Sequence, residues 1–469
     1  MLKNLLAACA VAAACGFASA QALLPPSVAD ALRRAQIPRE ATAVYVQQLG
    51  SPRAMLASNE TVPFNPASTM KLVTTNAALE TLGPAYTWKT RAYATGTQEG
   101  DVLGGDLVIK GSGDPKLRYE DLWMFLRRIR ERGIREIQGD LVLDRTAFEE
   151  VAFDAALFDG DPLKPYNVGP DALLLNYKAL NFRFVPDPAA GTVNVVVDPP
   201  LAGYPAVAPR LDGGECNDWR ASLQPTIGLL GAWFSGSYPL SCGERNWYLH
   251  PYPLSHPEYF HLAFRRLWTD LGGTLRGGAK LAPLPPDARL LAEWESPTLA
   301  EIVRDINKFS NNVMARQVLL TLGQASTGLP ANTAAGAAAV RNWLTARGVA
   351  APELSIENGS GLSRTERISA LSMAEMLNAA FHGPTMPEFI ASLPLAGTDG
   401  TMRKRLTNHT VAGRAHVKTG LLADARNIAG YVLAASGRRY LVVFMINHAN
   451  APRGSEAQDA LLQWVYEQG

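Results

Sequence analysis

The sequence has few of the features that build metal centres. It contains 4 cysteines and 7 histidines, with no CxxC pair and no HExxH motif. Both motifs place ligands at spacings that a turn or a helix brings together, so their absence argues against a zinc site. The sequence also has no GxSxG motif, which excludes the nucleophile elbow of an α/β-hydrolase. We predict no metal and no cofactor.

No charge of one sign prevails in the chain. Lys and Arg together number 44, and Asp and Glu number 43. This balance excludes a strongly basic nucleic-acid-binding protein and gives no electrostatic reason to bind an anionic membrane. With 47% hydrophobic and 19% charged residues, the chain is expected to be globular. Its 469 residues are enough for about three domains.

The N-terminus has the pattern of a secretory signal peptide over residues 1–20. Lys3 precedes an apolar run over residues 5–16, and Ala18 and Ala20 mark a small-residue cleavage site. The run is too short for a final transmembrane anchor. A lipoprotein cleavage site at Cys9 is the alternative, but the apolar stretch before it is very short. We therefore predict an exported protein without a transmembrane anchor.

Two cysteines, Cys216 and Cys242, remain after this cleavage. In an oxidising compartment such a pair usually forms a disulfide, which we predict here. Two free buried thiols are the alternative. Both cysteines lie in residues 199–254, a stretch dense in Gly, Pro and aromatic residues that predicts a small β-rich module.

Hydrophobic periodicity predicts alternating helices and strands along most of the mature chain. Strands are predicted over residues 41–48, 53–57, 86–94, 106–110, 140–143, 181–185, 192–197, 411–419, 429–434 and 440–446. Helices are predicted over residues 69–82, 119–132, 258–271, 299–308 and 312–322. Ser436 and Gly437 turn the last two strands into a hairpin. No internal repeat is present.

Ser68 and Lys71 form the only SxxK motif of the chain. Residues i and i+3 of a helix lie on one face, so the hydroxyl and the amine can touch. Pro66 and the helical run after it place Ser68 in the first helical turn, where free N–H groups favour developing negative charge. A lysine whose pKa is lowered by burial or by a second cation can take the proton of the serine. Alone, the motif also fits a capping serine and a solvated lysine.

Two further motifs follow along the chain. Ser310 and Asn312 form the only SxN motif, at a polar corner between two predicted helices, where an ordinary helix cap is the alternative. Lys418, Thr419 and Gly420 form the only KTG motif, in a predicted strand. Strand alternation puts Lys418 and Gly420 on one face, and the glycine lets a substrate backbone approach closely. An ordinary exposed strand lysine is the alternative.

The three motifs occur once each, in the order SxxK, SxN and KTG, on a helix, a corner and a strand. This set is the signature of penicillin-binding proteins and serine β-lactamases, which the chain resembles. Lys71 and Ser310 are 239 residues apart, so a large insertion separates them. This layout resembles the class C low-molecular-mass penicillin-binding proteins, the D-alanyl-D-alanine carboxypeptidase/endopeptidase family. Four other stretches also look like that family: residues 105–115, 139–144, 358–364 and 397–401.

The resemblance implies a mixed α/β (α+β) fold with a five-stranded antiparallel sheet, helices on both of its faces and two inserted β-rich domains. We predict the penicillin-binding domain at residues 21–84 and 285–469, one inserted domain at 85–165 and 250–284, and the other at 166–249. The implied function is a periplasmic serine DD-peptidase that acts on peptidoglycan peptides and is inhibited covalently by β-lactams. A serine β-lactamase and a non-catalytic β-lactam- or peptidoglycan-binding protein are the alternatives.

The resemblance also implies a role for each motif residue. Ser68 attacks the carbonyl of the penultimate D-Ala, and Lys71 takes its proton. Ser310 passes a proton to the leaving amine, and Asn312 positions the substrate. Lys418 binds the substrate carboxylate. The family further implies that the neighbouring substrate-binding residues are Thr419, Gly420 and Leu421.

Two positions, 358 and 421, depart from the family pattern. Two further residues, Asp161 and Arg364, belong to the site that the resemblance implies. Leu421 follows the KTG motif where the family usually has Ser or Thr, so one donor to the substrate carboxylate is missing. Asn358 stands where an Asp is common. By resemblance, Asp161 reaches from the inserted region towards the cleft and holds the free amine of the peptidoglycan side chain, and Arg364 shapes the same subsite. A solvated loop carboxylate is the alternative for Asp161.

Overall fold

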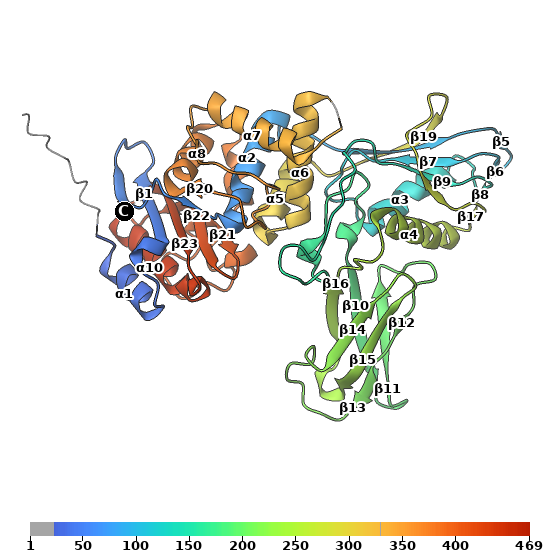
Figure 1. The fold of residues 1–469 in the computed structure, drawn as a ribbon, viewed down its shortest axis with the longest axis horizontal. Coiled ribbons are helices and arrows are strands. Elements are labelled where there is room, and N and C mark those ends of the chain that lie inside the picture. Colours follow the sequence, from blue (N-terminus) through green and yellow to red (C-terminus); the bar gives the residue numbers. More distant parts are fainter. Residues whose placement is uncertain (1–22, 329) are drawn as a thin grey trace, which may run out of the picture.

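The computed structural model describes residues 23–469 apart from residue 329, so the predicted signal peptide lies outside the described residues. Figure 1 shows one body that contains both the N-terminal and the C-terminal parts of the chain, and middle parts that extend away from it. Helices and several sheets are combined throughout the described chain, which confirms the predicted α+β fold.

The first body is built on a five-stranded sheet, which we call the main sheet. Its strands follow the spatial order β2 (Ala54–Ser58), β1 (Thr42–Gln48), β23 (Arg439–Asn447), β22 (Ala425–Leu433) and β21 (Ala415–Leu421). Every neighbouring pair is antiparallel. The predicted five-stranded antiparallel sheet is therefore confirmed, with β21 at one edge.

Both faces of the main sheet are buried, because its central strands carry apolar side chains on each face. On β23, Val442, Phe444 and Ile446 join one core cluster, whereas Leu441 and Val443 join another. Alternate side chains of a strand point to opposite faces, so this continuous apolar run requires a helical layer on each side. The helices α1 (Pro26–Arg34) and α10 (Ser455–Gln468) cover the face of the first cluster.

Helices on the other face carry most of the second cluster. They are α2 (Met70–Leu82), α5 (Leu299–Phe309), α6 (Asn312–Thr327), α7 (Thr333–Ala346), α8 (Ala370–His382) and α9 (Met386–Ser392). The residues of α2 from Met70 to Leu79 are all buried, which is the expected state of a helix without a polar face. A short two-stranded sheet, β3 (Pro63–Phe64) with β20 (Ile368–Ser369), borders this layer.

A second group of strands forms the body nearest to α6. Its larger sheet has the order β18 (Ala279–Leu281), β9 (Leu141–Asp144), β7 (Leu107–Lys110), β4 (Lys89–Ala94) and β19 (Arg289–Glu295). A smaller sheet has the order β17 (Thr274–Leu275), β8 (Glu136–Ile137), β6 (Val102–Leu103) and β5 (Gln98–Glu99). The helices α3 (Tyr119–Arg130) and α4 (His256–Asp270) pack against these strands. Because β19 pairs with β4, this group of strands continues to Glu295.

A third group of strands forms the lobe that points down in Figure 1. One sheet contains β11 (Thr192–Asp198), β10 (Leu180–Asp187) and β16 (Arg245–Leu249). The other contains β12 (Ala206–Val207), β15 (Ala232–Pro239), β13 (Arg210–Asp212) and β14 (Leu223–Ile227). Aromatic rings fill the space between the sheets, with Phe184 stacked on Tyr238 at 5.3 Å between ring centroids. The β-rich character predicted for residues 199–254 is confirmed.

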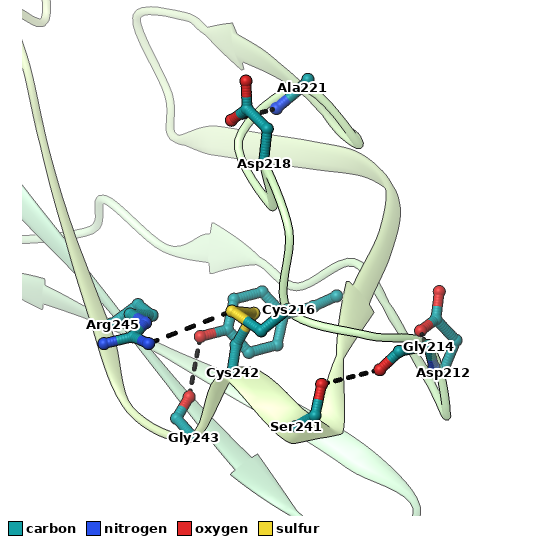
Figure 2. Close-up of a disulfide and its surroundings, with 10 residues drawn as sticks. Asp212, Gly214, Cys216, Asp218, Ala221, Ser241, Cys242, Gly243 and Arg245 are labelled. Atoms are coloured by element: carbon teal, nitrogen blue, oxygen red, sulfur yellow. Dashed lines mark hydrogen bonds between the residues drawn. A yellow bond between two sulfur atoms is a disulfide. The ribbon is translucent and has the colours of Figure 1, made fainter.

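The predicted disulfide joins Cys216 to Cys242 in this lobe. Figure 2 shows the bond beside the loop that carries Gly243, whose carbonyl accepts a hydrogen bond from Tyr238 Oη at 2.7 Å. The bond links the segment after β13 to the end of β15, and so ties the lobe together away from the main sheet.

Several expected elements have other bounds in the structure: β4 begins at Lys89 rather than at residue 86, and β22 begins at Ala425 rather than at residue 429. The strand predicted over residues 411–419 begins only at Ala415, because Gly413 has a φ of 70° and its N–H bonds to Ala396 O in a turn. The helical run predicted over residues 69–82 is divided into a 3-10 turn, η2 (Ala67–Thr69), and the helix α2. Ser68 therefore lies in the 3-10 turn that leads into α2.

Candidate active site

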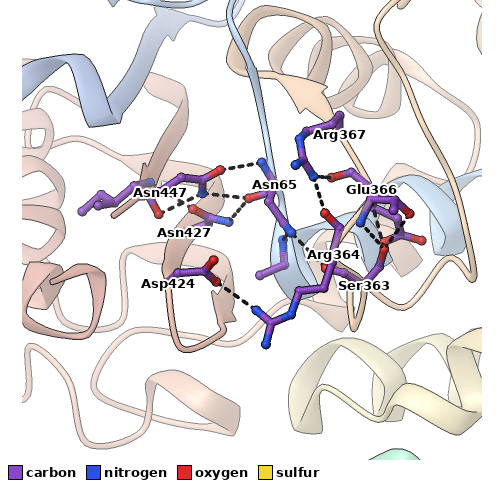
Figure 3. Close-up of polar contacts among 11 residues, drawn as sticks. Asn65, Ser363, Arg364, Glu366, Arg367, Asp424, Asn427 and Asn447 are labelled. Carbon is purple, nitrogen blue, oxygen red and sulfur yellow. Dashed lines mark hydrogen bonds and ion pairs between the residues drawn. The ribbon is translucent and has the colours of Figure 1, made fainter. Parts of the chain in front are cut away.

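Asn65 anchors the turn that carries Ser68. Its Oδ1 accepts a hydrogen bond from Ala67 N at 2.9 Å, and its Nδ2 donates to Ser363 O at 2.9 Å. Its backbone carbonyl accepts from Asn427 Nδ2 at 2.9 Å and from Asn447 Nδ2 at 3.1 Å. Figure 3 shows these bonds converging on Asn65. The turn is thus held against β22, β23 and the segment that contains Ser363.

Ser68 and Lys71 lie together, as the SxxK motif predicts. Lys71 Nζ is 3.0 Å from Ser68 Oγ. The amine also donates to Asn312 Oδ1 at 2.6 Å and to the carbonyl of Ser360. Lys71 is fully buried, because α2 is covered on all sides by neighbouring helices and by the sheet. The amine is therefore fixed next to the hydroxyl and shielded from bulk water.

Burial lowers the pKa of Lys71 well below its usual value. The neighbouring cation Lys418 and, more weakly, Arg316 lower it further, whereas the carboxylate of Glu366 raises it. Desolvation and like charges disfavour the protonated amine. A neutral Lys71 amine at 3.0 Å from Ser68 Oγ can act as the base that takes the serine proton.

Ser310 lies at the corner between α5 and α6, as predicted. It has a φ of 60°, the left-handed conformation that ends α5 and reverses the chain. Asn311 then caps α6 by accepting a hydrogen bond from Met314 N at 3.1 Å. The next residue, Asn312, accepts the Lys71 contact with its Oδ1 and donates from Nδ2 to Tyr166 O at 3.2 Å. The corner therefore links the serine–lysine pair to the region predicted to be inserted.

Lys418 occupies the buried face of the edge strand β21. Its Nζ is 2.9 Å from Ser310 Oγ and 2.6 Å from Thr419 O. Burial lowers the pKa of Lys418 to about 7. The motif residues therefore form two pairs, Ser68 with Lys71 and Ser310 with Lys418, and Asn312 contacts the first of them.

Gly420 permits β21 to approach the nucleophile turn. A Cβ at this position would lie 2.8 Å from Pro66 O and 3.1 Å from Ser68 N. The KTG motif predicts that this glycine lets a substrate backbone approach, and in the structure Gly420 also lies against the Ser68 turn. The neighbouring Leu421 side chain is 57% exposed, so it points away from this contact.

Thr401 is a hydroxyl of the site that the motifs did not reveal. Its Oγ1 is 2.7 Å from Thr419 Oγ1. The segment that carries it is held by Asp399, which lies 2.6 Å from the ammonium of Lys308 near the end of α5. Thr401 thus places a second hydroxyl beside Thr419.

A cavity of about 1120 Å³ lies between residues 143–172, 281–283, 330–333 and 357–365 and α6. None of the SxxK, SxN and KTG residues lines it. Arg364 lines it, with its guanidinium 4.5 Å from the ring of Phe158. Asp154 also lines the cavity, whereas Asp161 is not among the lining residues. The carboxylate of Asp161 accepts from Leu163 N at 3.2 Å and is 3.5 Å from Lys164 Nζ.

Residues 23–469, apart from 329, contain no group of three or more His, Cys, Asp and Glu side chains arranged to hold a metal ion. The helices of the same residues include none that is long and apolar enough to span a membrane.

The comparisons with known proteins identify the family of the chain. The family model of D-Ala-D-Ala carboxypeptidase 3 (S13) matches residues 24–468. A D-alanyl-D-alanine carboxypeptidase of an Actinomadura species is 29% identical over 84% of this chain and 76% of its own length. The D-alanyl-D-alanine carboxypeptidase DacB of Haemophilus influenzae is 25% identical over 81% of this chain and 80% of its own.

Solved structures show the same fold. Penicillin-binding protein 4 from Haemophilus influenzae superposes with a TM-score of 0.79 at 22% identity, covering 94% of this chain and 99% of that protein. Its complex with a β-lactam superposes with a TM-score of 0.75. The chain belongs to the D-Ala-D-Ala carboxypeptidase 3 (S13) family. The resemblance to class C penicillin-binding proteins and the predicted enzyme class are thereby confirmed.

Proposed function

We propose that the protein is a periplasmic serine DD-peptidase that uses Ser68 as its nucleophile. The substrates are peptidoglycan peptides, cleaved at D-Ala-D-Ala ends, at D,D-crosslinks, or at both. The observation that carries this proposal is the contact of Ser68 Oγ with the buried amine of Lys71 at 3.0 Å. The predicted signal peptide at residues 1–20 and the family membership support export to the periplasm.

Acylation follows from the two hydroxyl–amine pairs. Lys71 takes the proton of Ser68 as the serine attacks the carbonyl of the penultimate D-Ala. The backbone N–H groups of Ser68 and Leu421 form the oxyanion hole that stabilises the tetrahedral intermediate. Ser310, which is bonded to Lys418, delivers a proton to the leaving D-Ala amine. Water then hydrolyses the acyl-enzyme and regenerates Ser68.

β-Lactams fit the same chemistry as covalent inhibitors. Their strained amide takes the place of the D-Ala-D-Ala bond, and ring opening leaves the acyl group on Ser68. The β-lactam complex of the Haemophilus influenzae protein, which shares the fold, supports this assignment.

The domain arrangement proposed from the sequence keeps the site on the first body. The proposed penicillin-binding domain, residues 21–84 and 285–469, carries Ser68, Lys71, Ser310, Asn312 and Lys418. Within these bounds, β19 pairs with β4 of the second group of strands. The contact of Asn312 Nδ2 with Tyr166 O then joins that domain to an inserted one. This contact supports a role for the insertions in shaping the cleft.

Replacing Lys418 with Ala should weaken substrates that bear a free terminal carboxylate. A lost charged hydrogen bond costs about 1.5–3 kcal/mol. The measurement is kcat/KM for a D-Ala-D-Ala peptide and for a matched carboxylate-free ester. Equal losses for both substrates would count against the anchor role of Lys418.

Carboxylates of the loop over residues 154–161 should bind the side-chain amine of the peptidoglycan stem. We compare kcat/KM for a substrate with a free side-chain amine and for its N-acetylated form. Asp161→Ala tests the residue implied by the family, and Asp154→Ala tests the carboxylate that lines the cavity. At least one variant should lose the preference for the free amine and keep penicillin acylation, since a charge-assisted hydrogen bond is removed. If both variants keep the preference for the free amine, the carboxylates of this loop do not bind it.

The proposal as a whole is tested with purified muropeptides. Free D-Ala released from pentapeptides and monomers released from crosslinked dimers are measured by mass spectrometry. We expect at least one of the two products, and their ratio assigns the preference between carboxypeptidase and endopeptidase activity. Absence of both products from an enzyme that binds penicillin would contradict the peptidase function.

A further inference from the structure

Glu366 is a fully buried carboxylic acid beside the site, and the reaction steps above do not use it. Its Oε1 accepts three backbone N–H hydrogen bonds, at 2.8 to 3.2 Å, from residues 357–359. Its own N–H donates to Ser363 Oγ at 3.0 Å, a bond drawn in Figure 3. The Glu366 carboxylate therefore holds the backbone of residues 357–359, and Ser363 Oγ holds the backbone of Glu366.

The segment held by Glu366 is packed directly on the serine–lysine pair. The carbonyl of Ser360 accepts a hydrogen bond from Lys71 Nζ. The carbonyl of Gly359 accepts from Thr74 Oγ1 on α2 at 2.7 Å. A Cβ at Gly361 would lie 1.8 Å from Ala67 O, so this glycine touches the Ser68 turn. A shift of the segment would therefore move the groups that orient Lys71.

Glu366 also supplies negative charge to a cluster of cations. The pKa of Lys71 on α2 is lowered by the positive charges of Lys418 from β21 and Arg316 from α6, and raised by the negative charge of Glu366. Of these three groups, only Glu366 is acidic. Arg316 is also buried, and the charges of Glu366 and of the exposed Glu357 raise its pKa.

The second oxygen of Glu366, Oε2, is buried and has no hydrogen-bond partner among the described residues. Burial raises the pKa of this carboxyl above its usual value, and the backbone N–H groups and Lys71 offset part of that rise. Position 358 of the same segment is Asn, which carries no charge. Asn358 uses its side chain to bind Ser360 N at 2.9 Å and Leu362 O at 2.9 Å. The segment therefore carries its buried carboxylate at position 366.

We propose that Glu366 is a positioning residue for the serine–lysine pair, which holds residues 357–361 against Lys71 and provides the buried negative charge that balances the surrounding cations. The inference rests on the proposed role of Lys71 as the base of the reaction. Glu366 does not touch the substrate in this account. It acts through the carbonyl of Ser360 and through its charge.

The charge of Glu366 should change the pKa of Lys71 in one direction. A carboxylate near Lys71 stabilises the protonated amine, so its removal lowers the pKa of Lys71. Acylation needs the neutral amine, and its rate therefore rises with pH through an acid limb. The limb belongs to the coupled pair Lys71 and Lys418. Without the charge of Glu366, the midpoint of this limb moves to lower pH.

The test is the pH dependence of acylation by a fluorescent penicillin, measured for the full mature chain. In Glu366→Gln, the amide oxygen can still accept the backbone N–H groups while the charge is lost. We expect the midpoint of the acid limb to fall by about one pH unit. A purely structural role would lower the rate at every pH and leave the midpoint in place. An unchanged midpoint in a folded Glu366→Gln enzyme overturns the proposal.

Two further variants sharpen the test. Glu357→Gln removes an exposed carboxylate from the same segment, and solvent screening should limit its midpoint shift to about 0.3 pH units. Asn358→Asp combined with Glu366→Gln keeps one carboxylate in the segment and should retain most of the wild-type midpoint. The double variant also serves if Glu366→Gln alone does not fold. A midpoint shift as large in Glu357→Gln as in Glu366→Gln, or a folded double variant with the full shift, contradicts the proposal.

Failure of this inference is distinguishable from failure of the proposed function. If Ser68→Ala still reacts with the fluorescent penicillin, the nucleophile assignment is wrong and the pH profiles no longer report on Lys71. If Ser68→Ala is inert and the wild-type enzyme has an acid limb that Glu366→Gln leaves unmoved, only the role of Glu366 is wrong.

Discussion

Replacing Ser68 with Ala should abolish both covalent penicillin labelling and release of D-Ala. The hydroxyl is the only group within reach of Lys71 Nζ that the proposed mechanism uses as a nucleophile, at 3.0 Å. Where nucleophile and base act as a unit, loss of the nucleophile costs on the order of 10⁶ in kcat. The measurement is the rate of D-Ala release from a pentapeptide, together with fluorescence of the labelled protein band.

The Ser68→Ala protein should keep its fold. Ser68 is only partly buried, and the turn is held by Asn65 and by the bond of Thr69 Oγ1 to Pro66 O at 2.7 Å. Ser310→Ala is the matched control, since it removes the other hydroxyl that the proposed mechanism uses and should slow labelling without preventing it. Persistent labelling of a folded Ser68→Ala enzyme would show that another residue is the nucleophile.

Replacing Lys71 should have the second-largest effect. Lys71→Met removes the amine while keeping a buried side chain of similar length, and general-base catalysis typically contributes about 10²–10⁴-fold. Lys71→Arg keeps the positive charge but cannot give up its proton near neutral pH. We expect both variants to lose acylation by this factor, measured as the second-order rate constant with a fluorescent penicillin.

The pair of Lys71 variants separates two roles of the residue. If the amine is the base, Lys71→Arg is as inactive as Lys71→Met. If Lys71→Arg keeps most of the wild-type rate, the residue acts as a fixed cation, and the base must be sought elsewhere. Thermal unfolding of both variants serves as the folding control, because Lys71 also binds Asn312 Oδ1 and Ser360 O inside the core.

Strands of the main sheet and the three motifs could be predicted from the sequence because both leave local signals, whereas the five-stranded antiparallel sheet was implied by the resemblance to the family. The continuous apolar run of β23 requires a strand covered on both faces, and the structure buries it in two clusters. The spacing of Ser68 and Lys71 requires only one turn of chain to bring them together. The pairing of Cys216 with Cys242 followed because only two cysteines remain beyond the predicted signal peptide.

The supports of the site could not be predicted, because they depend on residues that are distant in sequence. Asn65 meets Asn447 across 382 positions, and neither residue belongs to a recognisable motif. Glu366 resembles any acidic residue until the structure shows that it is buried. The sequence also could not tell which acidic residue of the loop lines the cavity. Asp161 bonds to its own loop, whereas Asp154 lines the cavity.

The most direct test of the central claim is to locate the acyl group. The mature enzyme is incubated with penicillin, digested, and its peptides are mapped by tandem mass spectrometry. The account predicts one covalent adduct, with the mass of the intact opened β-lactam, on the peptide that contains Ser68 and on the Ser68 side chain itself. An adduct on Ser310 or on any other residue, or D-Ala release by an enzyme that never forms an adduct, would contradict it.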